Sequence, residues 1–255
     1  MTVDPGIVVV ITPAHNEAGN LAELHSRLRT ALDGAGIDWR WLLVDDVSDD
    51  ETFSVIGGLA ARDVRIGAIR LDRRTGSHLA LLAAMRHCAA WPDVAAVAVL
   101  ASDLQDPPEA LPGLIRDWQH GAEIVFAARK GPRGPPTLRN LAARAIYALV
   151  RLSVGPQAYP ASGADVAIFG RCALDRLARD PRPLGNLYVR AAKLGLPTAI
   201  ASVAKQERRS GSSSWSRAAL AVLAVTTIGE AFGLRFTAQQ DDAAVAASVG
   251  WVRVA

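Results

Sequence analysis

Short apolar runs alternate with longer segments of helical periodicity along the first half of the chain. The apolar runs are rich in β-branched residues and span Ile7–Thr12, Trp41–Val44, Ile66–Leu71, Val94–Leu100 and Ile124–Ala127. Continuous runs of this kind are typical of strands buried on both faces of a parallel sheet. Between them, apolar residues recur at helical spacing, as in the set Leu21, Leu24, Leu28 and Leu32. The alternation predicts a doubly wound α/β fold, a mostly parallel sheet with helices on both faces.

The regular alternation stops after Arg129, where a Pro- and Gly-rich loop occupies Lys130–Pro136. Such a loop continues neither a helix nor a central strand. A basic amphipathic helix is predicted next, over Leu138–Val154. Further strands are expected at Ala164–Phe169 and Thr198–Ala204, and further helices at Arg171–Ala178 and Leu187–Leu194. We therefore predict one domain over residues 1–217, followed over residues 218–255 by a helical appendage and a weakly patterned tail.

Composition supports one sizeable core but gives little reason to expect a nucleic-acid partner. The chain has 255 residues, half of them hydrophobic, which suits a single domain. Lys and Arg number 28 against 25 Asp and Glu, a net charge of only +3. This excess is too small to favour nucleic acid. Arginines do cluster between Arg129 and Arg151 and again at Arg208, Arg209 and Arg217, where an anionic partner would be sought.

The sequence favours a cytoplasmic protein, with a peripheral position on the cytoplasmic membrane face left open. Cys88 and Cys172 lack metal-ligand spacing, and no export signal is recognisable at the N-terminus. The apolar stretch Ala218–Gly229 is shorter than the roughly 20 residues that cross a bilayer, so we expect no transmembrane span. The basic helix at Leu138–Val154 fits either a membrane surface or a core-facing helix with a solvated edge.

Polar clusters follow the first four predicted strands, at Pro13–Glu17, Asp45–Asp50, Asp72–Ser77 and Ser102–Glu109. Ligands of open α/β sheets bind at the carboxyl ends of the strands, so chemistry is expected there. Asp46 can accept a hydrogen bond from a base N–H, and Asp103 can hold a divalent cation that neutralises a pyrophosphate. Asp49, Asp50 and Glu109 fit ordinary helix starts equally well.

Other nucleotide-binding classes lack their motifs. No G-x-G-x-x-G follows the first strand, and no G-x-x-x-x-G-K-[ST] occurs, which disfavours dehydrogenases and P-loop proteins. A nucleotidylyltransferase would need a Gly-rich basic first loop, which Pro13–Asn20 does not provide.

The order and spacing of four motifs resemble family 2 glycosyltransferases, over about residues 7–217. The branch most similar contains dolichyl-phosphate mannose synthases and bacterial polyprenyl-phosphate glycosyltransferases. The motifs are Pro13-Ala14-His15-Asn16-Glu17, Val44-Asp45-Asp46-x-Ser48-Asp49, Ser102-Asp103-Leu104-Gln105-Asp106-Pro107-Pro108-Glu109 and Arg208-x-x-Gly211-x-Ser213-x-Trp215.

The resemblance implies a GT-A fold and a set of site residues. The nucleoside pocket would be lined by Pro13, Glu17, Asp46 and Gly76, with Asp103 also contacting the nucleotide. Asp103 and Gln105 would hold Mg²⁺ or Mn²⁺, and Arg208 to Ser213 would close over the diphosphate. On the acceptor side, the resemblance implies Arg129, Arg139 and Asp165.

Three positions depart from the family pattern. The metal motif is usually Asp-x-Asp, but its first position here is Ala101, so one charged ligand is missing and metal affinity should fall. Arg74 replaces the usual Asn of an Arg-Asn-x-Gly turn and can partly compensate as a cation for phosphate oxygens. Ser214 replaces a usual basic residue.

The reaction implied is an inverting transfer of a sugar from a nucleoside-diphosphate sugar, with metal and Arg208 stabilising the leaving diphosphate. A polyprenyl phosphate acceptor is already an anion and needs no general base. A hydroxyl acceptor needs one, for which Asp165 is the candidate. A degenerate protein that binds a nucleotide sugar without turnover is the alternative suggested by Ala101 and Ser214.

Overall fold

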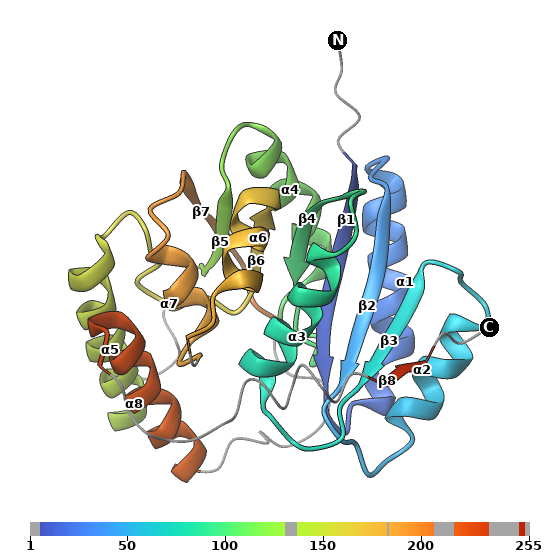
Figure 1. The fold of residues 1–255 in the computed structure, drawn as a ribbon, viewed down its shortest axis with the longest axis horizontal. Coiled ribbons are helices and arrows are strands. Elements are labelled where there is room, and N and C mark those ends of the chain that lie inside the picture. Colours follow the sequence, from blue (N-terminus) through green and yellow to red (C-terminus); the bar gives the residue numbers. More distant parts are fainter. Residues whose placement is uncertain (1–5, 131–136, 183, 207–216, 235–249, 253–255) are drawn as a thin grey trace.

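The computed structural model describes residues 6–130, 137–182, 184–206, 217–234 and 250–252. Its centre is an eight-stranded sheet in the order β7-β5-β6-β4-β1-β2-β3-β8 (Figure 1). The strands are β1 (Ile7–Ala14), β2 (Trp39–Asp45), β3 (Ile66–Arg70), β4 (Val94–Val99), β5 (Ile124–Arg129), β6 (Ala167–Gly170), β7 (Thr198–Val203) and β8 (Gly250–Val252). The helices are α1 (Ala18–Gly34), α2 (Thr52–Ala60), α3 (Ser77–Ala89), a 3₁₀ turn η1 (Pro108–Ala110), α4 (Leu111–Gln119), α5 (Leu138–Val154), α6 (Arg171–Arg179), α7 (Leu187–Ala192) and α8 (Arg217–Phe232).

Strand direction places most carboxyl ends at one edge of the sheet. β1 pairs in parallel with β2 and β4, β2 with β3, and β5 with β7. β6 is antiparallel to both β4 and β5, so its amino end lies at that same edge. The prediction of a mostly parallel α/β sheet is confirmed. The antiparallel direction of β6 was not predicted, because an apolar run is buried equally well in either direction.

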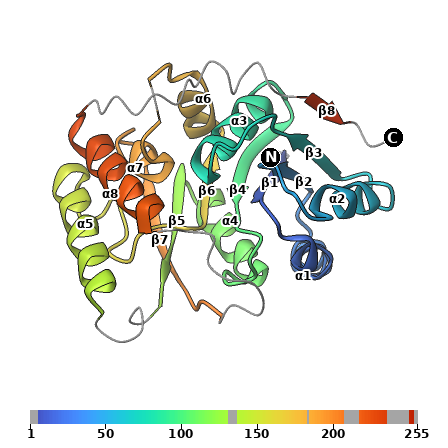
Figure 2. The same ribbon diagram turned by 90° about the horizontal axis from the view of Figure 1, so that it is seen from below.

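Alternate residues of β1 enter two separate cores, which explains the continuous apolar run Ile7–Ile11 at its start. Val9 and Ile11 belong to a core shared with α3, α6 and α7, whereas Val8 and Val10 belong to a core shared with α1, α2 and α4. Figure 2 shows these two helical layers on opposite faces of the sheet. Burying both faces favours apolar side chains along a central strand. The exception is the buried Thr12, whose Oγ1 accepts a hydrogen bond from Trp41 Nε1 at 2.9 Å.

The C-terminal helix α8 packs against α5 and α7 (Figures 1 and 2). A bidentate ion pair joins Arg190 of α7 to Glu230 of α8, with N–O distances of 3.0 and 2.7 Å. Both side chains are buried, and Ala231 enters the first core. The domain boundary at residue 217 stays a prediction. No helix in the described part of the chain has the length and apolarity that a membrane crossing requires.

The weakly patterned tail contains one strand that the sequence did not predict. Gly250–Val252 forms β8, antiparallel to β3, with Ala68 opposite Val252. Three residues are too short a window to show a period of two, and the open edge of β3 supplies the pairing that defines the strand. The predicted helix Leu138–Val154 is confirmed with the same bounds.

Candidate active site

Three loops at the carboxyl edge of the sheet contain a strained residue. Among the described residues, the non-glycine residues with positive φ are Asn16, Val47 and Leu104, at 57°, 57° and 59°. They lie in the polar clusters that follow β1, β2 and β4. Such conformations cost about 1–3 kcal/mol each, and a positive φ is especially unfavourable for a β-branched valine. Strain of this kind persists where surrounding contacts impose it, and it concentrates at functional sites.

Hydrogen bonds between the first two of these loops impose that geometry. Ser48 Oγ accepts a hydrogen bond from the Asn16 N–H at 3.1 Å, and Asn16 Oδ1 accepts one from the Asp49 N–H at 3.0 Å. Thr52 Oγ1 accepts from the Glu17 N–H at 2.8 Å. The loops after β1 and β2 are therefore fastened together, which places Glu17 at the carboxyl edge.

Asp46 joins the loop after β2 to the loop after β3. Its side chain is buried, and its Oδ1 and Oδ2 accept hydrogen bonds from the N–H groups of Thr75 and Gly76 at 2.7 and 2.8 Å. Gly76 has a φ of 81°, which favours glycine. The structure thus brings together Asp46 and Gly76, two of the predicted nucleoside-binding residues. Oδ1 also accepts from the Thr75 hydroxyl at 3.3 Å, whereas Oδ2 has a second lone pair with which Asp46 can accept from a base.

The loop after β4 contains Asp103 and Gln105. Asp103 Oδ1 accepts from the Gln105 N–H at 3.1 Å, and the strained Leu104 between them is buried. One residue earlier, Ser102 Oγ donates to the Pro13 carbonyl at 3.1 Å, which ties this loop to the end of β1. Pro13, a predicted pocket residue, therefore lies beside the Asp103 loop.

The donor atoms near Asp103 fit a metal ion shared with a diphosphate better than one held by protein alone. In the described ranges, no three His, Cys, Asp or Glu side chains form a group that would hold a metal ion. Asp103 offers a carboxylate and Gln105 an amide oxygen, whereas Ala101 offers no ligand. Mg²⁺ commonly binds through one or two carboxylates together with substrate phosphates and water. Asp103, with one carboxylate, and Gln105, with one amide oxygen, are sufficient protein ligands for a metal ion bound in this way.

Lys205 connects two carboxylates from different strand ends. It follows β7, and its Nζ lies 2.8 Å from Asp106 Oδ2 and 2.6 Å from Asp165 Oδ2. Burial acts to lower the pKa of Lys205, but the two carboxylates outweigh it and raise that pKa. Burial raises the pKa of Asp106 despite the opposing effect of Lys205. The sequence predicted Asp165 as a site residue but not Lys205. The only sequence signal for Lys205 is that it is a basic residue directly after a predicted strand.

The backbone beyond β7 rests on the loop after β4. The Gln206 N–H donates to the Gln105 carbonyl at 2.8 Å. Arg27 Nη1 donates to Gln206 Oε1 at 3.4 Å, and the same guanidinium forms a bidentate pair with Glu109. The predicted diphosphate segment Arg208–Ser213 begins just after this point and lies outside the described residues.

Of the two arginines predicted on the acceptor side, the structure describes the side chain of Arg129 but not that of Arg139. Arg129 ends β5, and its backbone N–H donates to Ser162 Oγ at 3.0 Å. Its Nε is buried and has no hydrogen-bond partner in the part of the chain that is described. Arg139 lies in the first turn of α5, and its side chain is outside the described residues. An orphaned guanidinium nitrogen at a strand end is a suitable donor for an anion.

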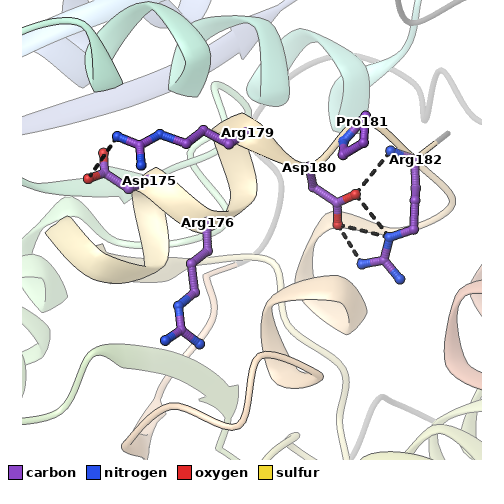
Figure 3. A pocket seen from close by; sticks show the side chains of 6 residues that line it. All are labelled: Asp175, Arg176, Arg179, Asp180, Pro181 and Arg182. Atoms are coloured by element: carbon purple, nitrogen blue, oxygen red, sulfur yellow. Dashed lines mark hydrogen bonds and ion pairs between the residues drawn. The ribbon is translucent and has the colours of Figure 1, made fainter.

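A cavity of about 430 Å³ lies elsewhere in the molecule. It is open to solvent and lined by Asp175, Arg176, Arg179, Asp180, Pro181 and Arg182 (Figure 3). Arg86, in the last turn of α3, donates to the Asp180 carbonyl at 3.4 Å. Since α3 starts beside Gly76, this cavity lies at the far end of that helix. Its carboxylates pair with its own arginines, so it is not the candidate site.

Comparisons with known proteins agree with this geometry. Residues 9–176 match the family model of glycosyl transferase family 2. The undecaprenyl-phosphate 4-deoxy-4-formamido-L-arabinose transferase of Shewanella sediminis is 34% identical over 58% of this chain and 44% of its own. An uncharacterized glycosyltransferase of Synechocystis sp. is 26% identical over 85% of this chain and 65% of its own. The chain thus spans less than two thirds of the length of these curated relatives.

Solved structures share the fold. Glucosyl-3-phosphoglycerate synthase of Mycobacterium tuberculosis, solved with Mn²⁺, uridine diphosphate and glucosyl-3-phosphoglycerate, has a TM-score of 0.60 at 17% identity, covering 91% of this chain and 82% of its own. Mannosyl-3-phosphoglycerate synthase of Rubrobacter xylanophilus has a TM-score of 0.62 at 18% identity, covering 92% and 78%. The family match covers well over half of the chain, and the fold is that of GT-A enzymes. The chain therefore belongs to glycosyl transferase family 2.

Proposed function

We propose that this protein is a metal-dependent, inverting hexosyltransferase that moves a sugar from a nucleoside-diphosphate sugar to a polyprenyl phosphate. The observation that carries the proposal is the convergence of three strained loops, around Asn16, Val47 and Leu104, on one edge of a family 2 sheet. Two comparisons support it: the name of the Shewanella relative includes a polyprenyl-phosphate substrate, and the Mycobacterium structure contains Mn²⁺ and uridine diphosphate.

On the donor side, Pro13, Glu17, Asp46 and Gly76 would line the nucleoside pocket. Asp103 and Gln105 would hold Mg²⁺ or Mn²⁺, which when bound would neutralise charge on the leaving diphosphate. Arg208 would add a second positive charge there. Fixed donors aimed at developing charge typically contribute a few kcal/mol each to lowering a barrier.

On the acceptor side, Arg129 and Arg139 would orient a lipid phosphate. Arg129 Nε is buried and has no hydrogen-bond partner among the described residues, which supports this role because a phosphate oxygen would satisfy it. A phosphate acceptor is already anionic, so no proton need be removed from it before it attacks the anomeric carbon.

The adjacent helices α5 and α8 suit a peripheral position at the membrane where a lipid acceptor resides. Among the described side chains of these helices, the large apolar ones that are exposed are Leu141, Leu149, Leu152, Val222, Val225 and Phe232. Leu152 is 80% exposed, and the exposed Arg144 lies on the same helix. Apolar residues beside cationic ones favour the interface of an anionic bilayer.

A hydroxyl acceptor remains the second candidate because of Asp165. This carboxylate lies at the carboxyl edge and is paired with Lys205, an arrangement that would fix a general base in one place. A protein that binds a nucleotide sugar without turnover is a third candidate, motivated by Ala101.

A transfer assay separates these three candidates. Purified protein would be incubated with Mn²⁺, a panel of radiolabelled nucleotide sugars, and either undecaprenyl phosphate in detergent or a soluble hydroxyl acceptor. The proposal predicts label in the lipid fraction, lost in Asp103→Asn. Label only in the soluble acceptor would favour Asp165 as base, and nucleotide binding without transfer to any acceptor would favour the degenerate protein.

A further inference from the structure

Lys205 is nearly enclosed by groups from three strand ends. Its side chain is 10% exposed, and that of Asp106 is 5% exposed, whereas Asp165 is half-exposed. Asp106 belongs to the loop after β4, Asp165 precedes β6, and Lys205 follows β7. One ammonium nitrogen therefore holds together loops that are far apart in the sequence.

The position of this ammonium is one that a metal ion would also favour. Two carboxylate oxygens from different loops point at the same nitrogen, so both lie within reach of one cation. Asp103 also acts electrostatically on Asp106, but no three such side chains of the described residues form a group that would hold a metal ion. Hard divalent cations prefer clusters of carboxylate oxygens, and affinity rises with the number of charged ligands. Lysine, a compact point charge with rotatable donors, satisfies two carboxylates in place of a metal.

The backbone next to Lys205 is also fixed. The Gln206 N–H donates to the Gln105 carbonyl at 2.8 Å, so the segment after β7 is held to the Asp103 loop by one backbone bond and one ion pair. Displacement of Lys205 would shift Asp165 relative to Asp103, because the ammonium bridges Asp165 and Asp106, and Asp106 lies in the same loop as Asp103.

We propose that Lys205 is a positioning residue, an internal counter-ion that holds Asp165 in place and prevents Asp106 and Asp165 from binding a divalent cation in the absence of nucleotide. The predicted effect of Lys205 on kcat rests on the proposed function. The predicted effect on Mn²⁺ binding does not depend on turnover. Asp103 and Gln105 would then hold the metal ion together with the diphosphate, and the pair Asp106 and Asp165 would not bind it.

The test compares Lys205→Met and Lys205→Arg with Lys193→Met as a matched control. Lys193 donates hydrogen bonds to the carbonyls of Glu230 and Ala231, away from the carboxyl edge of the sheet. Lys193→Met therefore also removes a hydrogen-bonded ammonium, but not one that contacts Asp106 or Asp165. Mn²⁺ binding without nucleotide is measured by electron paramagnetic resonance. We expect Lys205→Met to bind Mn²⁺ at least about tenfold more tightly than wild type, because it removes the ammonium that lies between the carboxylates of Asp106 and Asp165. Lys205→Arg and Lys193→Met should match wild type.

Turnover gives the second readout. We expect kcat of Lys205→Met to fall about tenfold or more, with the donor KM little changed, because misplacement of reacting groups mainly costs rate. Lys205→Arg, which keeps the charge, should recover most of that loss. If the Met variant does not fold, Lys205→Gln, which keeps hydrogen-bond donors but lacks the charge, carries the same two predictions.

Unchanged Mn²⁺ affinity in a folded, charge-removing variant would overturn the inference. So would an equal loss of kcat in Lys205→Arg and Lys205→Met. If wild type binds no nucleoside diphosphate, the proposed function fails, whereas the comparison of Mn²⁺ binding between wild type and variant still decides the role of Lys205.

Discussion

The backbone N–H of Thr75 donates a 2.7 Å hydrogen bond to Oδ1 of Asp46, which fixes the loop after β3 to the loop after β2. The next N–H, that of Gly76, donates to Oδ2 of the same carboxylate at 2.8 Å. A buried aspartate thus shapes a loop whose glycine has a φ of 81°. Asp46 is therefore a structural residue in addition to its proposed contact with the nucleoside.

Asp46→Asn should lower the free energy of unfolding by about 1–3 kcal/mol, because an amide NH₂ facing a backbone N–H cannot accept its hydrogen bond. Urea denaturation measures this. Asp72→Asn, an exposed change in the same loop, is the control. Equal stability of the two variants would show that the Thr75 and Gly76 contacts contribute nothing.

Asp103→Asn should abolish metal-dependent nucleotide binding and leave the fold intact, because it removes the one carboxylate of the proposed metal site. Calorimetric titration with and without Mn²⁺ measures the binding, and the melting temperature reports the fold. Asp38→Asn, exposed at the opposite edge of the sheet, should behave as wild type. Unchanged metal-dependent binding in Asp103→Asn would place the metal site elsewhere.

Ala101→Asp should tighten Mn²⁺ binding in the presence of nucleotide by roughly tenfold or more, since it adds a full negative charge at the predicted ligand position. Ala101→Asn, of similar size but neutral, is the matched control and should gain much less. Equal affinities for Ala101→Asp and wild type would mean that this position does not face the cation.

Arg139→Ala and Arg129→Met should raise the KM for the acceptor while leaving donor affinity unchanged, because each removes a cation proposed to face the acceptor phosphate. Initial rates at varied acceptor and fixed donor concentration measure the first quantity, and nucleotide titration measures the second. An equal loss of donor affinity in either variant would contradict its assignment to the acceptor side.

His78 predicts a dependence of stability on pH. Its Nδ1 is buried and has no hydrogen-bond partner in the described ranges, and its ring contacts Tyr188 edge-on. Burial lowers the pKa of His78 to about 4 despite the nearby charges of Asp165 and Glu230. An unfolded histidine has a pKa of about 6.5, so the unfolded chain binds more protons between these values. The free energy of unfolding should therefore fall as pH drops from about 6.5 towards about 4.

His78→Gln isolates this contribution. Urea denaturation at about pH 7.5 and about pH 5 should show a smaller loss of stability on acidification in the variant than in wild type, because the other titrating groups are common to both. The same loss in both proteins would show that His78 does not bind its proton preferentially in the unfolded state.

The parallel half of the fold was predictable because strands buried on both faces are mostly apolar and appear as continuous runs in the sequence. The polar clusters at the strand ends then placed Asp46, Gly76 and Asp103 at one edge. Strain at Val47 and Leu104 was not predictable, because these residue types normally avoid positive φ. Lys205 was not predicted as a site residue, because its partners Asp106 and Asp165 are 99 and 40 residues away and no local pattern connects them.

Calorimetric titration of the purified protein with UDP, GDP, CDP and TDP, each with and without Mn²⁺, tests the central claim most directly. A nucleotide-sugar site at Asp46 and Asp103 should bind one nucleotide in preference to the others, and only in the presence of the metal. Absence of binding to all four under both conditions would contradict a nucleotide-sugar site at Asp46 and Asp103.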